Sequence, residues 1–166
     1  MSEQGPSFKL PRYALTELTD AEAIAWIGAE VKGKAQAVDV GPVWLVAEVA
    51  EIAALESLTP DLARLAGYYE PLGMTGATLF AVNGDRVVVR SFAPADGIPE
   101  DPVCGSGNAS VAAFRLQAGQ LADGNSYLAS QGRQVGRDGK VLVRIDGADV
   151  HVGGHCVTCI VGAVTL

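Results

Sequence analysis

Two short turn signals most constrain the fold, because they divide the second half of the chain into β-hairpins. Asn83-Gly84 lies between β-branched runs in ATLFAVNGDRVVVRSFAP, and Asp146-Gly147 lies between runs in GKVLVRIDGADVHVGG. Asn, Asp and Gly tolerate the positive φ angles that tight hairpin turns require. Each pair therefore predicts two antiparallel strands, which for the second pair cover Val141–Ile145 and Ala148–Val152.

An apolar helix is predicted between the two hairpins, in the stretch SGNASVAAFRLQAGQ. Its apolar residues spread around the helix instead of lining one side, so the helix is expected to start near Ser106 and to be surrounded by protein. The hairpins and this helix together predict an α+β domain in which a largely antiparallel, curved sheet wraps one central helix.

Further elements are predicted from caps, breakers and apolar runs. Thr19 followed by Glu22 is typical of a capping box. The first 15 or so residues, with three Gly and Pro positions, are expected to be a linker or loose tail. The predicted elements are a helix over Thr19–Ala29, strands over Ala35–Val40 and Val43–Val49, a helix over Pro60–Tyr69, and a final strand over Val157–Leu166.

Composition narrows the classes of function. The 166 residues suit one domain, and a net charge of −7 with 12 scattered basic residues argues against nucleic acid or anionic lipid as a partner. No apolar run reaches the roughly 20 residues of a membrane helix. The start of the chain lacks the pattern of a secretion signal, so a cytoplasmic location is expected. Three cysteines, an odd number, favour a reducing compartment over a disulfide framework.

The segment PEDPVCGSGN concentrates groups suited to binding a small anion at the helix start. The first amides of a helix are unpaired and lie at its positive dipole end, which favours a carboxylate. Gly105 and Gly107 would let a ligand approach the backbone, while Ser106 and Asn108 add polar side chains. These four residues are the predicted substrate-binding residues.

Asp101 and Cys104 in the same segment are the predicted catalytic residues. The helix would favour a thiolate at Cys104, whereas the negative charge of Asp101 would oppose it. The pair could give and take one proton at a carbon next to a carbonyl or carboxylate. The purely structural alternative is a glycine-rich turn before a helix, with the cysteine as a small buried apolar residue.

Other polar clusters favour structural interpretations. His151, His155, Cys156 and Cys159 look like metal ligands in HVGGHCVTC, but on a strand the two cysteines face opposite sides, so no metal site is predicted. Arg133 and Arg137 are expected on a solvated turn rather than at an anionic substrate. The aromatic residues expected in a core or facing another lobe are Trp26, Trp44, Tyr68 and Tyr69.

The stretch RSFAPADGIPEDPVCGSGNASVAAF resembles the second half of PhzF-like phenazine biosynthesis proteins, which share the diaminopimelate epimerase fold. The likeness continues through PVWLVAEV, LTPDLARLAG and VHVGGHCVTCIVGAVTL. It implies two lobes, each a sheet curled around a helix, and proton transfer in the cleft between them without metal or organic cofactor. By resemblance Asp101 is the second-lobe catalytic aspartate, and Gly105 and Ser106 grip the substrate.

Cys104 departs from the usual pattern of that family, which has threonine at this position. With it, DPVCGSGN also resembles the Asp-x-x-Cys-Gly-x-Gly stretch of proline racemases and diaminopimelate epimerases. In those enzymes the cysteine is one of two acid/base residues. The resemblance therefore assigns Cys104 either an acid/base role or a polar contact.

The resemblance also implies that the first lobe is missing, since only 34 residues precede Ala35. Residues 1–34 are interpreted as linker or tail with one helix, and residues 35–166 as the second lobe. A two-sided proton transfer needs a group on each face of the substrate. We therefore expect half of an isomerase or epimerase for a small carboxylate-bearing metabolite, completed by a separate N-terminal lobe polypeptide or by a homodimer. The alternatives are a non-catalytic binding or assembly module, or a fragment of a longer protein.

Overall fold

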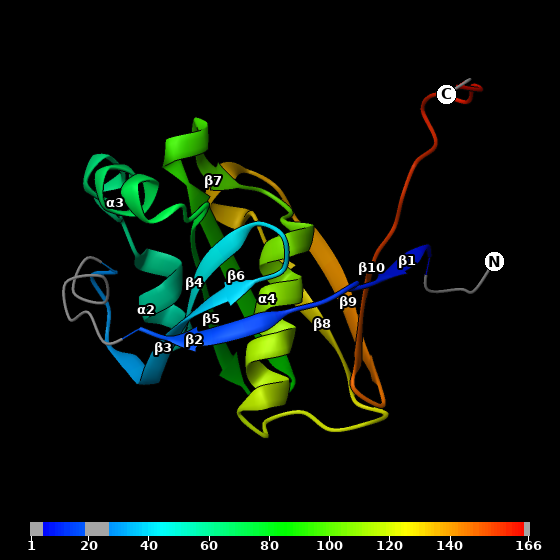
Figure 1. Cartoon of the computed structure of the whole chain (residues 1–166), viewed down its shortest axis with the longest axis horizontal. Helices are drawn as coiled ribbons and strands as arrows, with labels where there is room; N and C mark the ends of the chain where they lie inside the picture. Colours follow the sequence, from blue (N-terminus) through cyan, green and yellow to red (C-terminus); the bar gives the residue numbers. More distant parts are fainter. Residues whose placement is uncertain (1–4, 19–26, 165–166) are drawn as a thin grey trace.

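One continuous curved sheet surrounds a central helix in the computed structural model, which describes residues 5–18 and 27–164 (Figure 1). Within these residues the strand order is β1-β10-β9-β8-β6-β5-β4-β3-β2, with β7 paired to β6. The predicted α+β class is confirmed. The strands are β1 Ser7–Lys9, β2 Ala14–Glu17, β3 Val31–Asp39, β4 Val43–Val49, β5 Gly76–Asn83, β6 Arg86–Ala93, β7 Ile98–Asp101, β8 Ser126–Gln131, β9 Gly139–Asp146 and β10 Asp149–Gly153, and the helices are α2 Ile52–Ser57, α3 Leu62–Tyr69 and α4 Gly105–Gln117.

Helix α4 is the centre of the inner core. Every residue from Gly107 to Arg115 is buried, because the apolar positions lie on all sides of the helix and the sheet covers each of them. Phe114 packs edge-on against Phe80 of β5, with ring centroids 5.6 Å apart. The prediction of a helix surrounded by protein is therefore confirmed.

The N-terminal segment closes the sheet in front of α4 (Figure 1). Strand β1 pairs with β10, and β2 pairs with β3 at the opposite edge. Between them, the Leu10 amide donates to the Val150 carbonyl at 2.8 Å. The expected loose tail is wrong for these residues, because hydrogen bonds to two distant edge strands order a segment whose composition favours a loop. Strand β3 runs through position 34, and the proposed division of the chain there stays a prediction.

Helices α2 and α3 form a second layer on the outer face of the sheet, where β4, β5 and β6 are buried on both faces. Strands β9 and β10 instead alternate buried and less buried residues, as expected where only one face is covered. The predicted helix over Pro60–Tyr69 begins at Leu62, because the side chain of Asp61 accepts the Arg64 amide at 3.0 Å and caps the helix there.

Both predicted hairpins are confirmed, although their turns lie one residue later than the sequence suggested. Strands β5 and β6 are joined by Gly84-Asp85, and β9 and β10 by Gly147-Ala148. The two glycines have φ angles of 57° and 61°, and no other residue type has a positive φ in the part of the chain that is described. Glycine alone therefore supplies the positive φ, at the first position of each turn.

The chain beyond β10 leaves the body of the protein in an irregular conformation (Figure 1). The predicted strand is wrong for residues 157–164, because β1 already occupies the edge of β10 where it could have paired. The predicted helix over Thr19–Ala29 falls mostly on residues 19–26, outside the described residues, and residues 27–29 are not helical. No described helix is long and apolar enough to cross a membrane.

Candidate active site

Strand β7 delivers Asp101 to the start of α4. Asp101 pairs with Ser91 of β6, and its Oδ1 accepts the Val103 amide at 2.9 Å, which tightens the chain into the helix. The negative charge of Asp101 acts on the thiol of Cys104 three residues later and raises the pKa of that thiol. The structure thus brings together the two residues that the sequence predicted as an acid/base pair.

Cys104 is the N-cap residue of α4. Its backbone is extended, with φ −94° and ψ 109°, and its Sγ accepts the Gly107 amide at 3.2 Å. The Oγ of Ser106 lies 3.5 Å from the same sulfur. A cysteine sulfur therefore performs the capping role that Ser, Thr, Asp or Asn usually performs.

Burial is the largest influence on the ionisation of Cys104. It raises the pKa of the thiol above its ordinary value of 9.0, and the charge and hydrogen bond of Asp101 raise it further. Hydrogen bonds from Ser106 and Gly107 act in the opposite direction. Since the net change is upward, the sulfur carries its proton at neutral pH, and the expected thiolate-favouring effect of the helix is outweighed.

Gln131, at the end of β8, holds this loop in place and was missed from the sequence. It is 1% exposed. Its Oε1 accepts the Cys104 amide at 3.2 Å and the Asn108 side-chain amide at 2.7 Å, and its Nε2 donates to the Asp101 carbonyl at 2.8 Å. No sequence pattern around Gln131 distinguishes it from other polar residues of the chain.

The four predicted substrate-binding residues occupy two environments. Gly105 and Ser106 are half-buried, and a Cβ on Gly105 would meet only the Phe8 ring, at 4.0 Å. Gly107 and Asn108 are buried. Their binding of a substrate stays a prediction, and the half-buried pair is the more accessible.

Gly107 and Asn108 have packing roles in the structure. A Cβ on Gly107 would lie 2.6 Å from Ser91 Oγ and 2.8 Å from Thr78 Oγ1, so glycine is required for the close approach of α4 to β5 and β6. The Asn108 amide nitrogen donates to the Cys104 carbonyl at 2.8 Å as well as to Gln131. Both residues therefore fix the helix start.

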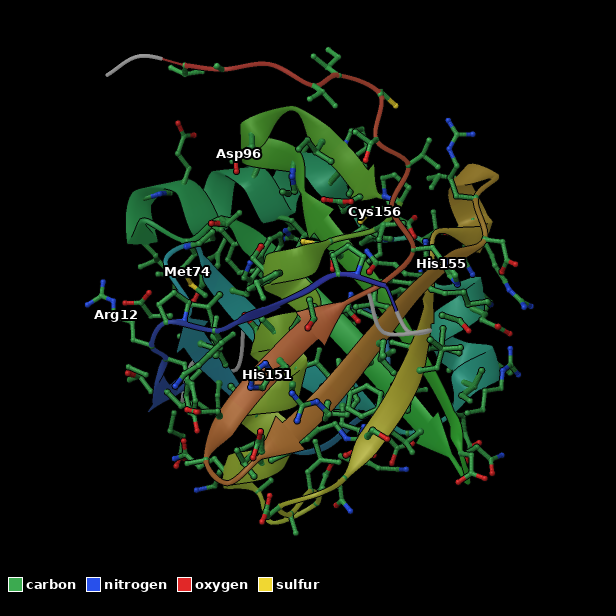
Figure 2. The ribbon with its side chains drawn as sticks, turned by 90° about the vertical axis from the view of Figure 1, so that its right-hand side faces the viewer. Arg12, Met74, Asp96, His151, His155 and Cys156 are labelled. Carbon is green, nitrogen blue, oxygen red and sulfur yellow. The ribbon has the colours of Figure 1, made fainter. Side chains whose placement is uncertain are left out.

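A hollow of about 360 Å³ opens beside Gly105. Its walls come from β1, from the end of β10 and from the first residues of the C-terminal segment, where Cys156 lies (Figure 2). Most of this lining is apolar. Of the predicted site residues only Gly105 lines the hollow, and its other lining residues are Pro6, Ser7, Phe8, Val141, Val152, Gly153, Gly154 and Cys156.

Glu100, next to Asp101, is committed to a buried ion pair. Its carboxylate accepts from Arg90 Nε at 2.9 Å and from the terminal nitrogen Nη2 at 2.7 Å, and both side chains are less than one tenth exposed. Arg90 also donates to the carbonyls of Leu55 and Leu58 at the end of α2. This network anchors β7 and leaves Asp101 as the acid that faces Cys104.

The remaining polar clusters do not form a further site. No three His, Cys, Asp or Glu side chains are grouped to hold a metal ion in residues 5–18 and 27–164. The strand argument against a metal at Cys156 and Cys159 does not apply, since these exposed residues are not on a strand. Arg133 and Arg137 lie on an exposed turn, as predicted.

Comparison with known proteins agrees with this architecture. Residues 1–162 match the family described as phenazine biosynthesis-like protein. The chain belongs to this family. Antisense-enhancing sequence 1 of Schizosaccharomyces pombe is 30% identical, over 94% of this chain and 57% of that protein. Trans-2,3-dihydro-3-hydroxyanthranilate isomerase of Pseudomonas chlororaphis is 32% identical, over 76% of this chain and 46% of that protein.

Members of the phenazine biosynthesis-like family also share the fold. A PhzF-family protein of Bacillus anthracis superposes with a TM-score of 0.73 at 15% identity, over 89% of this chain and 56% of that one. A predicted epimerase of Pseudomonas aeruginosa gives 0.70 at 25% identity, over 90% and 54%. The chain thus spans little more than half the length of these structures. An uncharacterized isomerase of Schizosaccharomyces pombe is 31% identical over 78% of this chain and 75% of its own length.

Proposed function

We propose that this chain is one lobe of an isomerase or epimerase that transfers a proton at a carbon acid. The observation that carries the proposal is the placement of Asp101, at the end of β7, next to Cys104, whose sulfur caps a buried helix. Membership of the phenazine biosynthesis-like family supports the isomerase class. The amides of Gly105 and Ser106, at the positive end of the helix dipole, favour a small substrate that carries a carboxylate.

Cys104 is the proton donor in the proposed step. Its thiol is protonated at neutral pH because burial raises its pKa. When the S–H bond breaks and the proton passes to a substrate carbanion, the sulfur anion is stabilised by the Gly107 amide at 3.2 Å and by Ser106. Asp101, which is half-buried and whose charge acts on the thiol, then takes a proton from solvent and passes it to the sulfur.

The carbanion must be formed by a second group that removes a proton from the opposite face of the substrate. We propose that a first lobe supplies that group, because the chain spans 57% of one relative and 54% of one structural neighbour. This lobe belongs to a separate N-terminal polypeptide, to a second copy of this chain, or to a longer protein of which this chain is a part. A single lobe then holds the carboxylate and one acid/base residue, and the partner completes the site.

The C-terminal segment supports the existence of such a partner. Four aliphatic side chains on it are at least 85% exposed, namely Val157, Ile160, Val161 and Val164. Soluble proteins rarely leave an apolar run of this kind uncovered. Its β-branched composition suits addition to a sheet edge, and since the edge of β10 is taken by β1, we propose that it adds to an edge of the partner.

Hydrogen–deuterium exchange at the substrate carbon tests this proposal. The chain is incubated in D₂O with a panel of carboxylate-bearing carbon acids, alone and with a candidate first-lobe polypeptide from the same organism. We expect deuterium incorporation only in the assembled complex or in a homodimer, and its loss in Cys104→Ser and Asp101→Asn. An assembled complex that incorporates no deuterium into any of these compounds contradicts the proposal.

The second candidate is a non-catalytic binding or assembly module. The observation that favours it is the burial of Cys104, at 5% exposed, beside a hollow whose walls are mostly apolar. In that case the complex binds carboxylates without exchange, and Cys104→Ser changes neither binding nor assembly. The exchange experiment therefore distinguishes the two candidates.

A further inference from the structure

Trp44 of β4 contacts the active-site serine from within the core. Its side chain is 3% exposed, and its indole Nε1 lies 3.1 Å from Ser106 Oγ. An indole N–H can only donate a hydrogen bond. The oxygen of Ser106 is therefore the acceptor in this contact, and the hydrogen of its own hydroxyl points elsewhere.

The sulfur of Cys104, 3.5 Å from Ser106 Oγ, is the partner in reach for that hydrogen. The hydroxyl of Ser110 does not compete, because it donates to the backbone carbonyl of Ser106 at 2.9 Å and not to the hydroxyl. The indole therefore donates to Ser106, which leaves the Ser106 hydroxyl able to donate to Cys104.

We propose that Trp44 is a positioning residue, which fixes Ser106 as a hydrogen-bond donor to Cys104 and thereby promotes ionisation of the sulfur. The importance of this for catalysis rests on the proposed function, but the effect on the thiol does not. Hydrogen bonds in such a chain strengthen one another in a dry environment. Without the indole donor, Ser106 is free to turn its hydrogen away from the sulfur.

Few other groups act on Cys104. Asp101 on β7 is the charged residue that affects its ionisation among those described. Gln131 on β8 is neutral, as are Thr78 on β5 and Ser91 on β6, whose hydroxyls lie under the first turn of α4. A change in the thiol caused by a substitution at Trp44 therefore has Ser106 as its route.

The test is a titration of Cys104 by the ultraviolet absorbance of the thiolate. Cys156→Ser and Cys159→Ser remove the two exposed thiols, and the spectrum of the same chain carrying Cys104→Ser is subtracted. Trp44→Phe is expected to lower the thiolate fraction at a fixed pH below the midpoint by about threefold to tenfold, since one hydrogen bond to a charged sulfur is weakened.

The sign of the change separates positioning from structural damage. A loosened core would admit water to Cys104, and because burial raises the pKa of this thiol, water would increase the thiolate fraction. Val46→Ala, in the same strand and buried in the same cluster without a contact to Ser106, is the matched control and is expected not to lower the fraction. An unchanged or increased fraction in Trp44→Phe overturns the proposal.

A double-mutant cycle adds an independent criterion. Ser106→Ala alone should lower the thiolate fraction, and adding Trp44→Phe to it should have no further effect, because the route through the hydroxyl is already gone. Additive effects contradict the proposal. If Trp44→Phe does not fold, benzothienylalanine at position 44 keeps the shape of the indole, removes only its N–H, and is subject to the same criteria. If the deuterium-exchange experiment fails but Trp44→Phe lowers the thiolate fraction as expected, only the proposed function is overturned.

Discussion

The side-chain amide of Asn108 donates to Gln131 Oε1 at 2.7 Å inside the protein. The side chain of Gln131 also accepts a hydrogen bond from the Cys104 amide and donates one to the Asp101 carbonyl. Gln131 therefore joins the first turn of α4, its cap and the end of β7 to strand β8. The geometry of the proposed acid/base pair depends on this one side chain.

Replacing Gln131 with Met, which has a similar shape, should strongly destabilise the protein. The buried polar groups of Cys104, Asn108 and Asp101 would lose their partner, which lowers the free energy of unfolding by about 2–4 kcal/mol. Urea unfolding measures the change. Gln117→Met, at the exposed end of α4, is the control and should change the free energy by less than about 0.5 kcal/mol. Equal effects of the two substitutions would argue against the role of Gln131.

Alanine should destabilise the protein much more at Gly107 than at Gly105. Gly107→Ala places a methyl group 2.6 Å from Ser91 Oγ, which forces α4 to shift and lowers the free energy of unfolding by about 1–3 kcal/mol. Gly105→Ala meets nothing closer than Phe8 at 4.0 Å, and its effect should stay within about 1 kcal/mol. Thermal unfolding of both variants checks this ranking, and a more stable Gly107→Ala would contradict the packing described.

The ion pair of Arg90 and Glu100 should be costly to break from one side. Arg90→Met leaves a buried carboxylate unpaired and removes the guanidinium donor from the carbonyls of Leu55 and Leu58, so the free energy of unfolding should fall by about 3–5 kcal/mol. Arg144→Met, which breaks an exposed pair, should change it by less than about 1 kcal/mol. Denaturant titration of both variants measures the contrast, and an equal loss in the two would contradict it.

Alkaline pH should destabilise the protein partly through Cys104. Burial raises the pKa of its thiol above the ordinary 9.0, so the folded state holds this proton more tightly than the unfolded chain. The resulting stability is fully present below pH 9.0 and is lost as pH rises through the folded-state pKa. The free energy of unfolding should therefore fall more steeply above pH 9.0 in the wild type than in Cys104→Ser. Urea unfolding at a series of pH values measures this. If wild type and Cys104→Ser lose stability in parallel, burial does not raise the pKa of this thiol.

Removal of the chain after His155 should separate folding from assembly. Residues 156–164, the described part of the removed segment, make no strand pairing, so the free energy of unfolding should change by less than about 1 kcal/mol. Association with a first-lobe polypeptide, or with a second copy, should weaken, since the exposed aliphatic side chains are lost. Sedimentation velocity of the full and shortened chains measures this. Undiminished association would show that the partner binds elsewhere.

The parts of the fold that the sequence predicted depend on local interactions. Gly84 and Gly147 fix their hairpins through backbone freedom within two residues, and α4 is defined by apolar positions on all sides. Strand β1 and the segment after β10 were mispredicted for a shared reason. Both were candidates for one sheet edge, and which of them pairs with β10 depends on the whole sheet, not on the composition of either segment.

The candidate site, like the fold, could be predicted only where its residues are close in the sequence. Asp101, Cys104 and Gly105 lie within one turn, so their proximity follows from the sequence alone. Trp44 and Gln131 reach the site through strand pairing, from 62 residues before Ser106 and 27 residues after Cys104. No local pattern marks either residue as part of a site, because their contribution arises only when the sheet closes around α4.

The central claim is that Asp101 and Cys104 act together at the start of α4, with the charge of Asp101 controlling the proton of the thiol. Titration of the Cys104 thiolate in the wild type and in Asp101→Asn tests it most directly, since Asn keeps the oxygen that accepts the Val103 amide and removes only the charge. Our account predicts a lower titration midpoint in Asp101→Asn, because the charge of Asp101 raises the pKa of the thiol. An unchanged or higher midpoint would show that the two groups are not coupled, and it would remove the basis of the proposed acid/base pair.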